Sequence, residues 1–335
     1  LASFGPFEEK NYQVELISGV YIPENPCGMD IDEMLNRANM ARKSIVSPRG
    51  SRILFFTEEL RKKALAGIEM EAEMRSALDK EEFVLYFQPQ IKLTDVSGQK
   101  AHRAEALVRW MRNGRIYAMP DDFIGLFEKN GMIAELDLYI YERICILINR
   151  FKACGLTSVC IAVNVSRHTM MQPDFVETYL EIKKRYRIED DELELEFTES
   201  IAVAELALMQ KVLKQLKKAG FICAMDDFGT GYSSLNVLQI LPLDILKLDK
   251  GFLACEGEDR RRQIVVKSVL QMAKQLDMLT IVEGVENEEQ LHLLQKVGCD
   301  YLQGFLVSPP LSEDEYSSFV KEEEFHGGES EIRQI

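Results

Sequence analysis

Acidic and amide side chains, together with one lysine, recur along this sequence at the ends of short apolar runs, and the chemistry of the oxygen-bearing side chains suits divalent cations. They are Gln88, Glu105, Asn164, Glu196 with Glu199, Asp226 with Asp227, Lys247 with Asp249, Glu283 and Gln303. Carboxylate and amide oxygens are the ligands that hard ions prefer. Adjacent Asp226 and Asp227 could serve two ions together, and two ions about 3.5–4 Å apart are the usual arrangement for in-line hydrolysis of phosphate esters.

The charge of this set also favours bound cations. Glu105, Glu196, Asp226, Asp227 and Glu283 supply negative charge, and Lys247 returns one positive charge. Two like charges about 4 Å apart repel by roughly 4 kcal/mol at an effective dielectric of about 20, so two divalent ions would relieve a large cost. Each residue alone has a plain structural explanation, such as a solvated strand edge or a turn. Their recurrence favours a metal site, and Gly229-Thr230-Gly231 adds a loop whose amides could face an anion.

The elements that carry these residues alternate between short apolar runs and helical stretches. The expected strands are Val84–Phe87, Ala104–Val108, Val159–Val163, Leu193–Phe197, Ile222–Met225, Ile245–Leu248, Thr280–Val282 and Tyr301–Leu302. Among the helices, one ends at Gly220 and another begins at Asn287, with Gln290 in capping-box position, and ends at Gly298. This alternation predicts a (β/α) barrel or a doubly wound sheet. Only a barrel brings the polar strand ends together on one face, so the barrel is favoured.

The remaining segments are smaller. Residues 1–56 predict a strand at Val14–Tyr21, a helix opened by Asp30 and a strand at Ile53–Phe56, which together enclose little core. A charged connecting helix is expected over 57–78, with Thr57 as its N-cap. The barrel is expected over 79–322, and residues 323–335 are expected to form a flexible tail.

Composition excludes several classes of protein. The chain of 335 residues is 46% hydrophobic and 28% charged, as in ordinary globular proteins, and no apolar run is long enough to span a membrane. Its net charge of −15 disfavours long nucleic acid as a ligand. The seven Cys form no C-x-x-C pair, which indicates reduced thiols. Without an initiator Met or a signal pattern, the sequence is interpreted as a fragment of a longer protein.

Motifs in the expected barrel resemble those of the EAL-domain family of cyclic-di-GMP (c-di-GMP) phosphodiesterases. They include Tyr86-Phe87-Gln88-Pro89, Glu105-Ala106-Leu107-Val108-Arg109-Trp110, Val163-Asn164-Val165-Ser166, Leu195-Glu196-Phe197-Thr198-Glu199-Ser200, Asp226-Asp227-Phe228-Gly229-Thr230-Gly231-Tyr232-Ser233-Ser234-Leu235, Leu246-Lys247-Leu248-Asp249, Val282-Glu283-Gly284-Val285-Glu286 and Gln303-Gly304. The resemblance implies an EAL-type (β/α)8 TIM-like barrel with an antiparallel first strand. It also implies a cytoplasmic homodimer, paired through the barrel, that uses two divalent cations, Mg²⁺ or Mn²⁺, to hydrolyse c-di-GMP to linear 5′-pGpG.

The same resemblance implies roles for individual residues. Lys247 takes the position that orients the attacking water and, secondarily, moves its proton; Glu199 takes that of the residue holding the Asp-Phe-Gly-Thr-Gly loop, and Glu286 that of a supporting carboxylate. The metal-ligand positions are Glu105, Asn164, Glu196, Asp226, Asp227 and Glu283, and the substrate-contact positions are Gln88, Leu107, Arg109, Asp249 and Gln303.

Two departures from the family pattern, Gln90 and the Pro-Pro sequence after Ser308, are interpreted as carrying no chemistry. Residues 1–56 resemble the second half of a GGDEF domain, without the half that would hold the nucleotide-binding hairpin. Two alternatives to the enzyme stay open: a non-catalytic c-di-GMP receptor of EAL type, and a protein that regulates a partner through its barrel surface.

Overall fold

The computed structural model describes residues 16–23, 28–45, 52–93, 102–156, 159–229, 235–253 and 260–325. The chain divides into two compact units, Leu1–Ser76 and Ala77–Ile335. The loop residues 230–234, which include most of the expected Gly-Thr-Gly-Tyr-Ser-Ser stretch, lie outside the described residues, as does the segment 326–335 of the expected tail.

The first unit contains a small parallel β–α–β arrangement. Strand β1 (Ile17–Val20) pairs in parallel with β2 (Arg52–Phe55), and α1 (Ile31–Lys43) connects them. Helix α1 begins at Asp30, whose carboxylate accepts a hydrogen bond from the Asp32 backbone N–H at 3.3 Å. The expected order of strand, helix and strand is therefore confirmed for the described part of this unit.

Helix α2 (Glu58–Asp79) follows and runs across the boundary between the units. As the sequence predicts, it begins after Thr57, whose hydroxyl oxygen accepts a hydrogen bond from the Leu60 backbone N–H at 3.1 Å. This bond satisfies one of the amide groups that a helix N-terminus leaves without an intrahelical partner.

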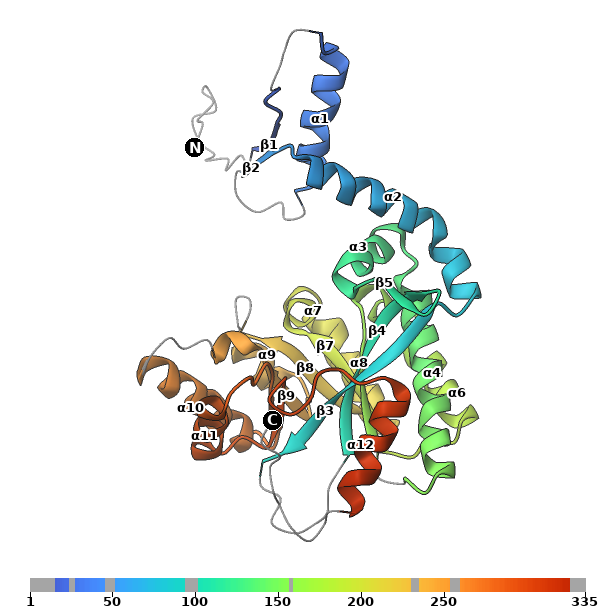
Figure 1. Ribbon diagram of the computed structural model, residues 1–335. Coiled ribbons are helices and arrows are strands. Elements are labelled where there is room, and N and C mark those ends of the chain that lie inside the picture. Colours follow the sequence, from blue (N-terminus) through green and yellow to red (C-terminus); the bar gives the residue numbers. More distant parts are fainter. Residues whose placement is uncertain are drawn as a thin grey trace. The chain divides into compact units, whose positions relative to one another are not determined.

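The second unit is a closed eight-stranded barrel (Figure 1). Its strands are β3 (Phe83–Lys92), β4 (His102–Arg112), β6 (Val159–Asn164), β7 (Leu193–Thr198), β8 (Ile222–Phe228), β9 (Ile245–Leu248), β10 (Leu279–Val282) and β11 (Tyr301–Gln303). Strand β3 pairs antiparallel with both β4 and β11 and so closes the ring, while every other neighbouring pair around it is parallel. Each strand predicted for the barrel is present, and the antiparallel first strand is confirmed.

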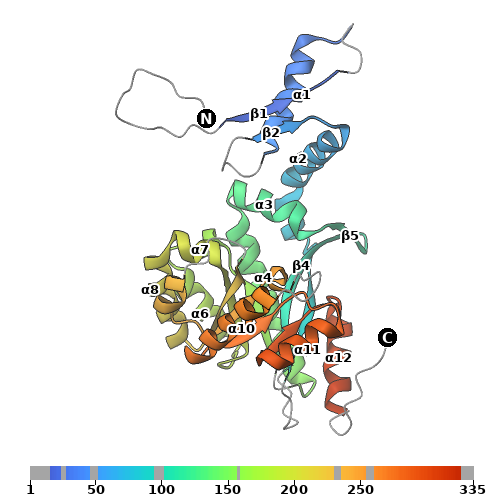
Figure 2. The ribbon, with the colours of Figure 1, turned by 90° about the vertical axis from the view of Figure 1, so that its left-hand side faces the viewer.

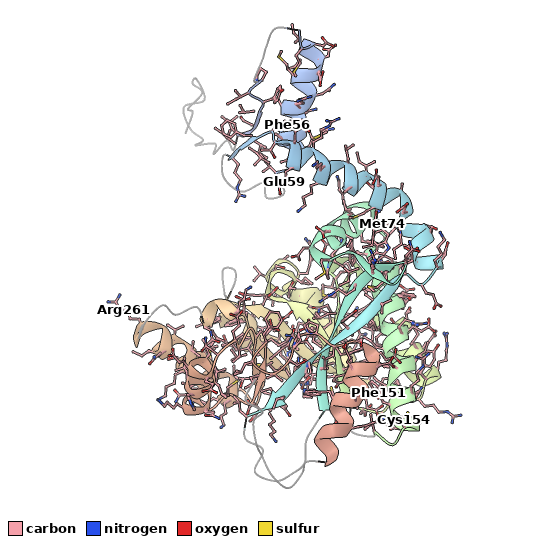
Figure 3. All side chains as sticks on the ribbon, viewed as in Figure 1. Phe56, Glu59, Met74, Phe151, Cys154 and Arg261 are labelled. Atoms are coloured by element: carbon pink, nitrogen blue, oxygen red, sulfur yellow. The ribbon has the colours of Figure 1, made fainter. Side chains whose placement is uncertain are left out.

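Helices cover the outside of this barrel, as the two views of Figures 1 and 2 show. The longer ones are α3 (Pro120–Asn130), α4 (Ile133–Ala153), α6 (Phe175–Arg185), α8 (Leu206–Lys218), α10 (Arg260–Gln275), α11 (Glu288–Val297) and α12 (Glu313–Phe325). The shorter ones are α5 (Arg167–Met170), α7 (Glu199–Ala204), α9 (Leu235–Ile240) and the 3₁₀ turn η1 (Lys250–Phe252). Helix α12 is anchored by Tyr316, whose ring lies 5.3 Å from that of Phe87 and 5.8 Å from that of Phe151, labelled in Figure 3. Because helices cover the strands, the strands are nearly continuous in apolar residues on that side.

The helix ends follow the predicted capping. Asn287 accepts a hydrogen bond from the Gln290 backbone N–H at 3.0 Å, and the Gln290 side chain accepts one from the Asn287 backbone N–H, which completes a capping box. Gly298 ends the same helix in the left-handed conformation.

Two features differ from the expected boundaries. A ninth strand, β5 (Arg115–Ala118), extends β4 as a hairpin whose turn residues Asn113 and Gly114 both have positive φ. The Asn-Gly pair favours a type I′ turn, so the sequence contained a signal from which this hairpin could have been predicted. Helix α12 also continues to Phe325, past the expected end of the barrel at residue 322, through a run of glutamates that favours helix. No helix within the described ranges is long and apolar enough to cross a membrane.

Candidate functional site

Polar side chains line the barrel interior above an apolar floor. Ala224, Ile245, Ile281 and Tyr301 form a buried cluster, and each precedes a predicted site residue by two positions on its own strand. Since side chains alternate between the faces of a strand, the residues two positions further on face the same interior. Asp226, Lys247, Glu283 and Gln303 are these residues, and they converge toward the carboxyl ends of β8, β9, β10 and β11.

A β-bulge at the end of β8 explains how two consecutive aspartates reach one site. The pairing of β8 with β9 shifts register between Met225 and Phe228, and Asp227 has a positive φ of 56°. On a regular strand the carboxylates of Asp226 and Asp227 would point to opposite faces, but a bulge re-aims one of them. Consistent with this, one oxygen each of Asp226, Asp227 and Glu283 lie within 4.8 Å of one another.

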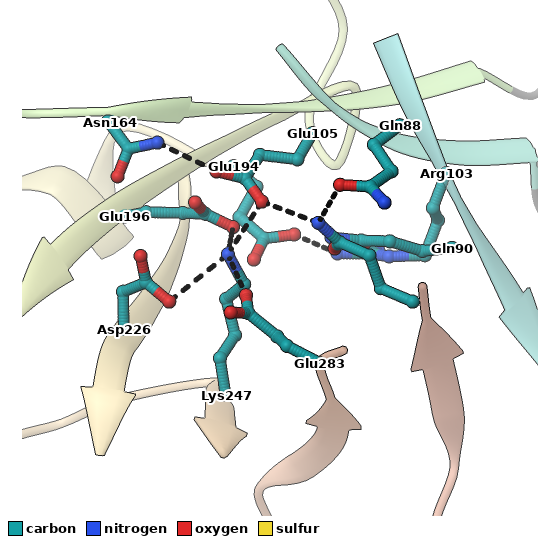
Figure 4. A network of polar contacts seen from close by, with 11 residues as sticks. Gln88, Gln90, Arg103, Glu105, Asn164, Glu194, Glu196, Asp226, Lys247 and Glu283 are labelled. Carbon is teal, nitrogen blue, oxygen red and sulfur yellow. Dashed lines mark hydrogen bonds and ion pairs between the residues drawn. The ribbon is translucent and has the colours of Figure 1, made fainter. Parts of the chain in front are cut away.

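Lys247 is the centre of the site (Figure 4). Its ammonium lies 2.7 Å from carboxylate oxygens of Glu196 and Glu283, 3.1 Å from Glu105 and 3.2 Å from Asp226. The side chain is 0% exposed, so these ion pairs form away from bulk water. Asn164 is exposed and Asp227 and Glu283 are half-buried, so the site opens to solvent on their side.

Burial and mutual repulsion set the protonation of this cluster. Burial lowers the pKa of Lys247, but the surrounding carboxylates outweigh it and raise that pKa well above its ordinary value, so the side chain is an ammonium. Burial and the nearby charge of Glu105 raise the pKa of Glu196 well above its ordinary range, and burial raises the pKa of Glu283 to about 8. Burial opposes ionisation of Glu105 as well, but Lys247 and three hydrogen bonds lower its pKa. The raised pKa values of Glu196 and Glu283 indicate that one lysine does not offset the cost of ionising all of these buried carboxylates.

Glu105 is held by side-chain amides from two other strands. The Asn164 amide donates to one of its oxygens at 2.9 Å, and the Gln303 amide donates to the other at 2.7 Å. The same Gln303 nitrogen donates to the Gln88 side-chain oxygen at 3.2 Å. Asn164 and Gln303 thus reach the carboxylate from β6 and β11 and fix its orientation, while Gln88 of β3 accepts the second hydrogen bond of the Gln303 amide.

The donor set fits divalent cations. Oxygens of Glu105, Glu196 and Asp226 form one compact group, and Asp226, Asp227 and Glu283 form a second, with Asp226 shared between the two. One carboxylate oxygen of Glu196 lies 2.7 Å from the Lys247 ammonium, but the other has no hydrogen-bond donor among the described residues, although the side chain is only 1% exposed. Buried carboxylate oxygens without hydrogen-bond donors are suited to a metal ion, since burying them unpaired is costly.

Glu199 lies on the loop side of the site. One of its oxygens accepts a hydrogen bond from the Gly229 backbone N–H at 3.0 Å, directly after the aspartate pair. A Cβ at Gly229 would lie 2.0 Å from the Phe252 ring, so only glycine fits there. The role of Glu199 in holding the rest of that loop stays a prediction.

A cavity of about 700 Å³ lies beside the carboxylate cluster. Leu107, Asn164 and Asp227 belong to its wall, together with residues of α3 and α4. The buried Asp137 of α4 also lines it and accepts hydrogen bonds from the Ser166 backbone N–H at 2.9 Å and the Thr169 hydroxyl at 2.5 Å. Asp137 therefore fixes the turn that follows Asn164.

Three further predicted residues, Arg109, Asp249 and Glu286, make no ion pair with Lys247. Arg109 is largely buried, donates to the Val108 carbonyl oxygen at 2.9 Å and places its guanidinium 5.7 Å from the centre of the Tyr86 ring. Asp249 caps the 3₁₀ turn η1 by accepting from the Gly251 backbone N–H at 2.7 Å. Glu286 is exposed.

Sequence reasoning missed three buried polar groups. Gln90, interpreted as carrying no chemistry, is 2% exposed and donates to the Gln303 side-chain oxygen at 2.9 Å, a contact that the sequence did not predict. Arg103 and Glu194 form a buried ion pair below Glu105 and Glu196. Each of these residues is two positions from a recognised site residue on a strand, a spacing that could have revealed them. Asp137 could have been found as the single acidic residue on a buried helix face.

Comparisons with known proteins agree with this geometry. The family model described as "EAL domain" matches residues 71–310. Cyclic di-GMP phosphodiesterase NbdA of Pseudomonas aeruginosa is 33% identical over 85% of this chain and 36% of its own length. Signaling protein YkoW of Bacillus subtilis is 30% identical over 95% of this chain and 39% of its own length, so the chain spans less than two fifths of either relative. The solved structure "PaMucR Phosphodiesterase, c-di-GMP complex" is similar at a TM-score of 0.67, with 31% identity over 73% of this chain and 98% of that one.

Proposed function

The chain belongs to the EAL-domain family, and on that premise we propose that it is a phosphodiesterase that hydrolyses c-di-GMP to linear 5′-pGpG. The observation that carries the proposal is the set of carboxylates around Lys247, in which one buried oxygen of Glu196 contacts the ammonium and the other has no hydrogen-bond donor among the described residues. An EAL barrel that had lost its chemistry would not need to maintain so costly an accumulation of buried charge.

The proposed metal ligands are the residues that the sequence predicts. Glu105, Asn164, Glu196, Asp226, Asp227 and Glu283 would hold two divalent cations, Mg²⁺ or Mn²⁺. When bound, such ions lower the pKa of a water and neutralise charge on the phosphodiester.

Lys247 is proposed to orient the attacking water. As an ammonium it has only protons to donate, so it can hold the water oxygen but cannot take a proton while its pKa stays high. In the reaction the water oxygen bonds to phosphorus, the P–O3′ bond breaks, and O3′ leaves with a proton as a hydroxyl. The products are one 5′-phosphate and one 3′-hydroxyl per diester opened.

Substrate binding is proposed for the residues beside and above this cluster. Leu107 lines the adjacent cavity, and Arg109 offers a guanidinium fork suited to a phosphodiester. Gln88 and Asp249 are proposed to contact the nucleotide as well. Gln303 is proposed to do so only in part, because its amide nitrogen already donates to Glu105 and Gln88.

The test is incubation of c-di-GMP with the protein and Mg²⁺ or Mn²⁺, with EDTA as a control, and separation of products by chromatography. We expect metal-dependent formation of 5′-pGpG, which Glu105→Ala abolishes. If c-di-GMP stays intact but binds to the protein in calorimetry, the proposed enzymatic activity is wrong and the receptor alternative is supported.

Other expectations from the sequence stay proposals. The β1–α1–β2 unit is proposed to be the second half of a GGDEF domain, and the barrel is proposed to form a cytoplasmic homodimer. Sedimentation velocity over a range of concentrations tests the dimer, and a monomer at the highest concentration would refute it.

A further inference from the structure

Hydrogen bonds between three buried side chains, Gln90, Gln303 and Glu105, connect the strand pair that closes the barrel, β3 and β11, to the carboxylate cluster. The Gln90 amide donates to the Gln303 side-chain oxygen at 2.9 Å, and the Gln303 amide donates to Glu105 at 2.7 Å. Gln90 pairs with Gln303 across β3 and β11, and Glu105 pairs with Gln88 across β4 and β3. All three residues are at most 6% exposed, so water cannot replace these contacts readily.

The hydrogen-bonding capacity of each group fixes the direction of the chain. An ionised Glu105 carboxylate only accepts, so the Gln303 amide must present its nitrogen to it. Both N–H bonds of that nitrogen are then used, one toward Glu105 and one toward Gln88. The Gln303 side-chain oxygen therefore faces Gln90 and accepts a hydrogen bond from the Gln90 amide nitrogen.

We propose that Gln90 is a positioning residue: it fixes the amide orientation of Gln303, and through it the Glu105 carboxylate that holds cations. This proposal rests on the proposed function. Without a donor at position 90, the Gln303 side-chain oxygen is left buried without its partner, so the amide is held less firmly and its hydrogen bond to the Glu105 carboxylate weakens.

A set of glutamine-to-methionine variants tests this proposal. Gln90→Met keeps the side-chain length and apolar packing but removes the donor. We expect its Mn²⁺ affinity, measured by electron paramagnetic resonance of free Mn²⁺, to fall by about tenfold or more, as when residues behind metal ligands are changed. We expect kcat for c-di-GMP to fall with it, while KM changes little, because Gln90 touches no substrate-contact position except Gln303.

Two further variants separate positioning from general destabilisation. Gln210→Met makes the same chemical change at a half-buried glutamine on α8 that donates to the Ile240 carbonyl oxygen at 3.2 Å, outside the barrel interior. It should leave Mn²⁺ affinity and kcat unchanged. If Gln90 acts through Gln303, then Gln90→Met should have almost no further effect in a Gln303→Met background.

The outcomes decide the proposal separately from the proposed function. Wild-type Mn²⁺ affinity in Gln90→Met, or additive losses in the double variant, would overturn the positioning role. If wild-type protein binds Mn²⁺ but cleaves no c-di-GMP, the proposed function fails while the Mn²⁺ comparison still decides the role of Gln90. If Gln90→Met does not fold, selective ¹⁵N-glutamine labelling of the wild type decides: slowly exchanging side-chain amides for Gln90 and Gln303 support the chain, and fast exchange overturns it.

Discussion

Replacing Lys247 with methionine should make the stability of the protein depend strongly on divalent metal. Lys247 is the cation at the centre of four carboxylates. Lys247→Met removes its charge and keeps most of its apolar stem. The carboxylates are then left buried without a counter-charge, and added Mg²⁺ or Mn²⁺ can supply one.

The size of the effect follows from the distances. Each ion pair, at 2.7 to 3.2 Å, has a Coulomb energy of about 5–6 kcal/mol at an effective dielectric of about 20. Desolvation of the charges offsets much of this, and protonation of Glu283, whose pKa burial raises to about 8, relieves part of the repulsion. Loss of one partner from a buried ion pair typically costs about 3–5 kcal/mol. At about 2–4 °C per kcal/mol for a domain near this size, Tm in EDTA should fall by roughly 10 °C.

The measurement is thermal unfolding of wild type and variant in EDTA and in millimolar Mn²⁺. Binding to the folded state alone raises stability with ligand concentration in both proteins. The increment should be larger for Lys247→Met, because the lysine no longer competes with cations for the carboxylates. Turnover of c-di-GMP should be lost even where Tm is restored.

A matched control is available in Lys183, which is buried and donates to Asp190 at 2.6 Å and to the carbonyl oxygens of Ala219 and Gly220 at 2.8 and 2.9 Å. Lys183→Met should lower Tm without any added gain from Mn²⁺. If Lys247→Met is as stable as wild type in EDTA, or gains no more from Mn²⁺ than the control does, the electrostatic reasoning is wrong.

Three other predictions concern different parts of the barrel. Glu105→Ala should lower kcat by more than the roughly 10–100-fold that is typical when a residue that only supports a metal ligand is lost. A smaller loss would argue against Glu105 as a metal ligand. Asp137→Ala should cost about 1–3 kcal/mol in urea unfolding, since it leaves the Ser166 N–H without its acceptor, whereas Asp137→Asn should cost less. Of the five cysteines that the structure describes, only the exposed Cys154 (Figure 3) should be alkylated in the native protein at pH 8. The other four thiols are buried, and burial raises their pKa values, to about 12 for Cys145. Peptide mapping that finds label on Cys145 would refute this prediction.

The barrel could be predicted from the sequence because its strands are short apolar runs with polar residues at their ends. Lys247 and Glu283 each stand out as a charge at the end of such a run. The pattern indicated that these side chains meet, but it could not say which of them touch. The contacts of Lys247 with four carboxylates depend on strand stagger around the closed ring, which spacing along one chain does not specify.

The bulge at Asp227 illustrates a second limit. Strict alternation would send Asp226 and Asp227 to opposite faces, so the period of a strand argues against a joint site. Only the register shift against β9 and the positive φ of Asp227 bring both carboxylates inward. The contact of Gln90 could not be predicted for a related reason: its partner Gln303 lies 213 positions away in sequence.

That separation has a consequence for the order in which the molecule assembles. The ring closes only when β11 pairs with β3, and contacts between such distant segments form late in folding because they close a long loop. During synthesis most of the barrel core can leave the ribosome while β3 still has an unpaired edge. The Glu105 carboxylate therefore receives its Gln303 hydrogen bond only after the last strand arrives. In refolding experiments, recovery of Mn²⁺ binding should lag behind recovery of helical circular dichroism, so that metal binding reports the moment of ring closure.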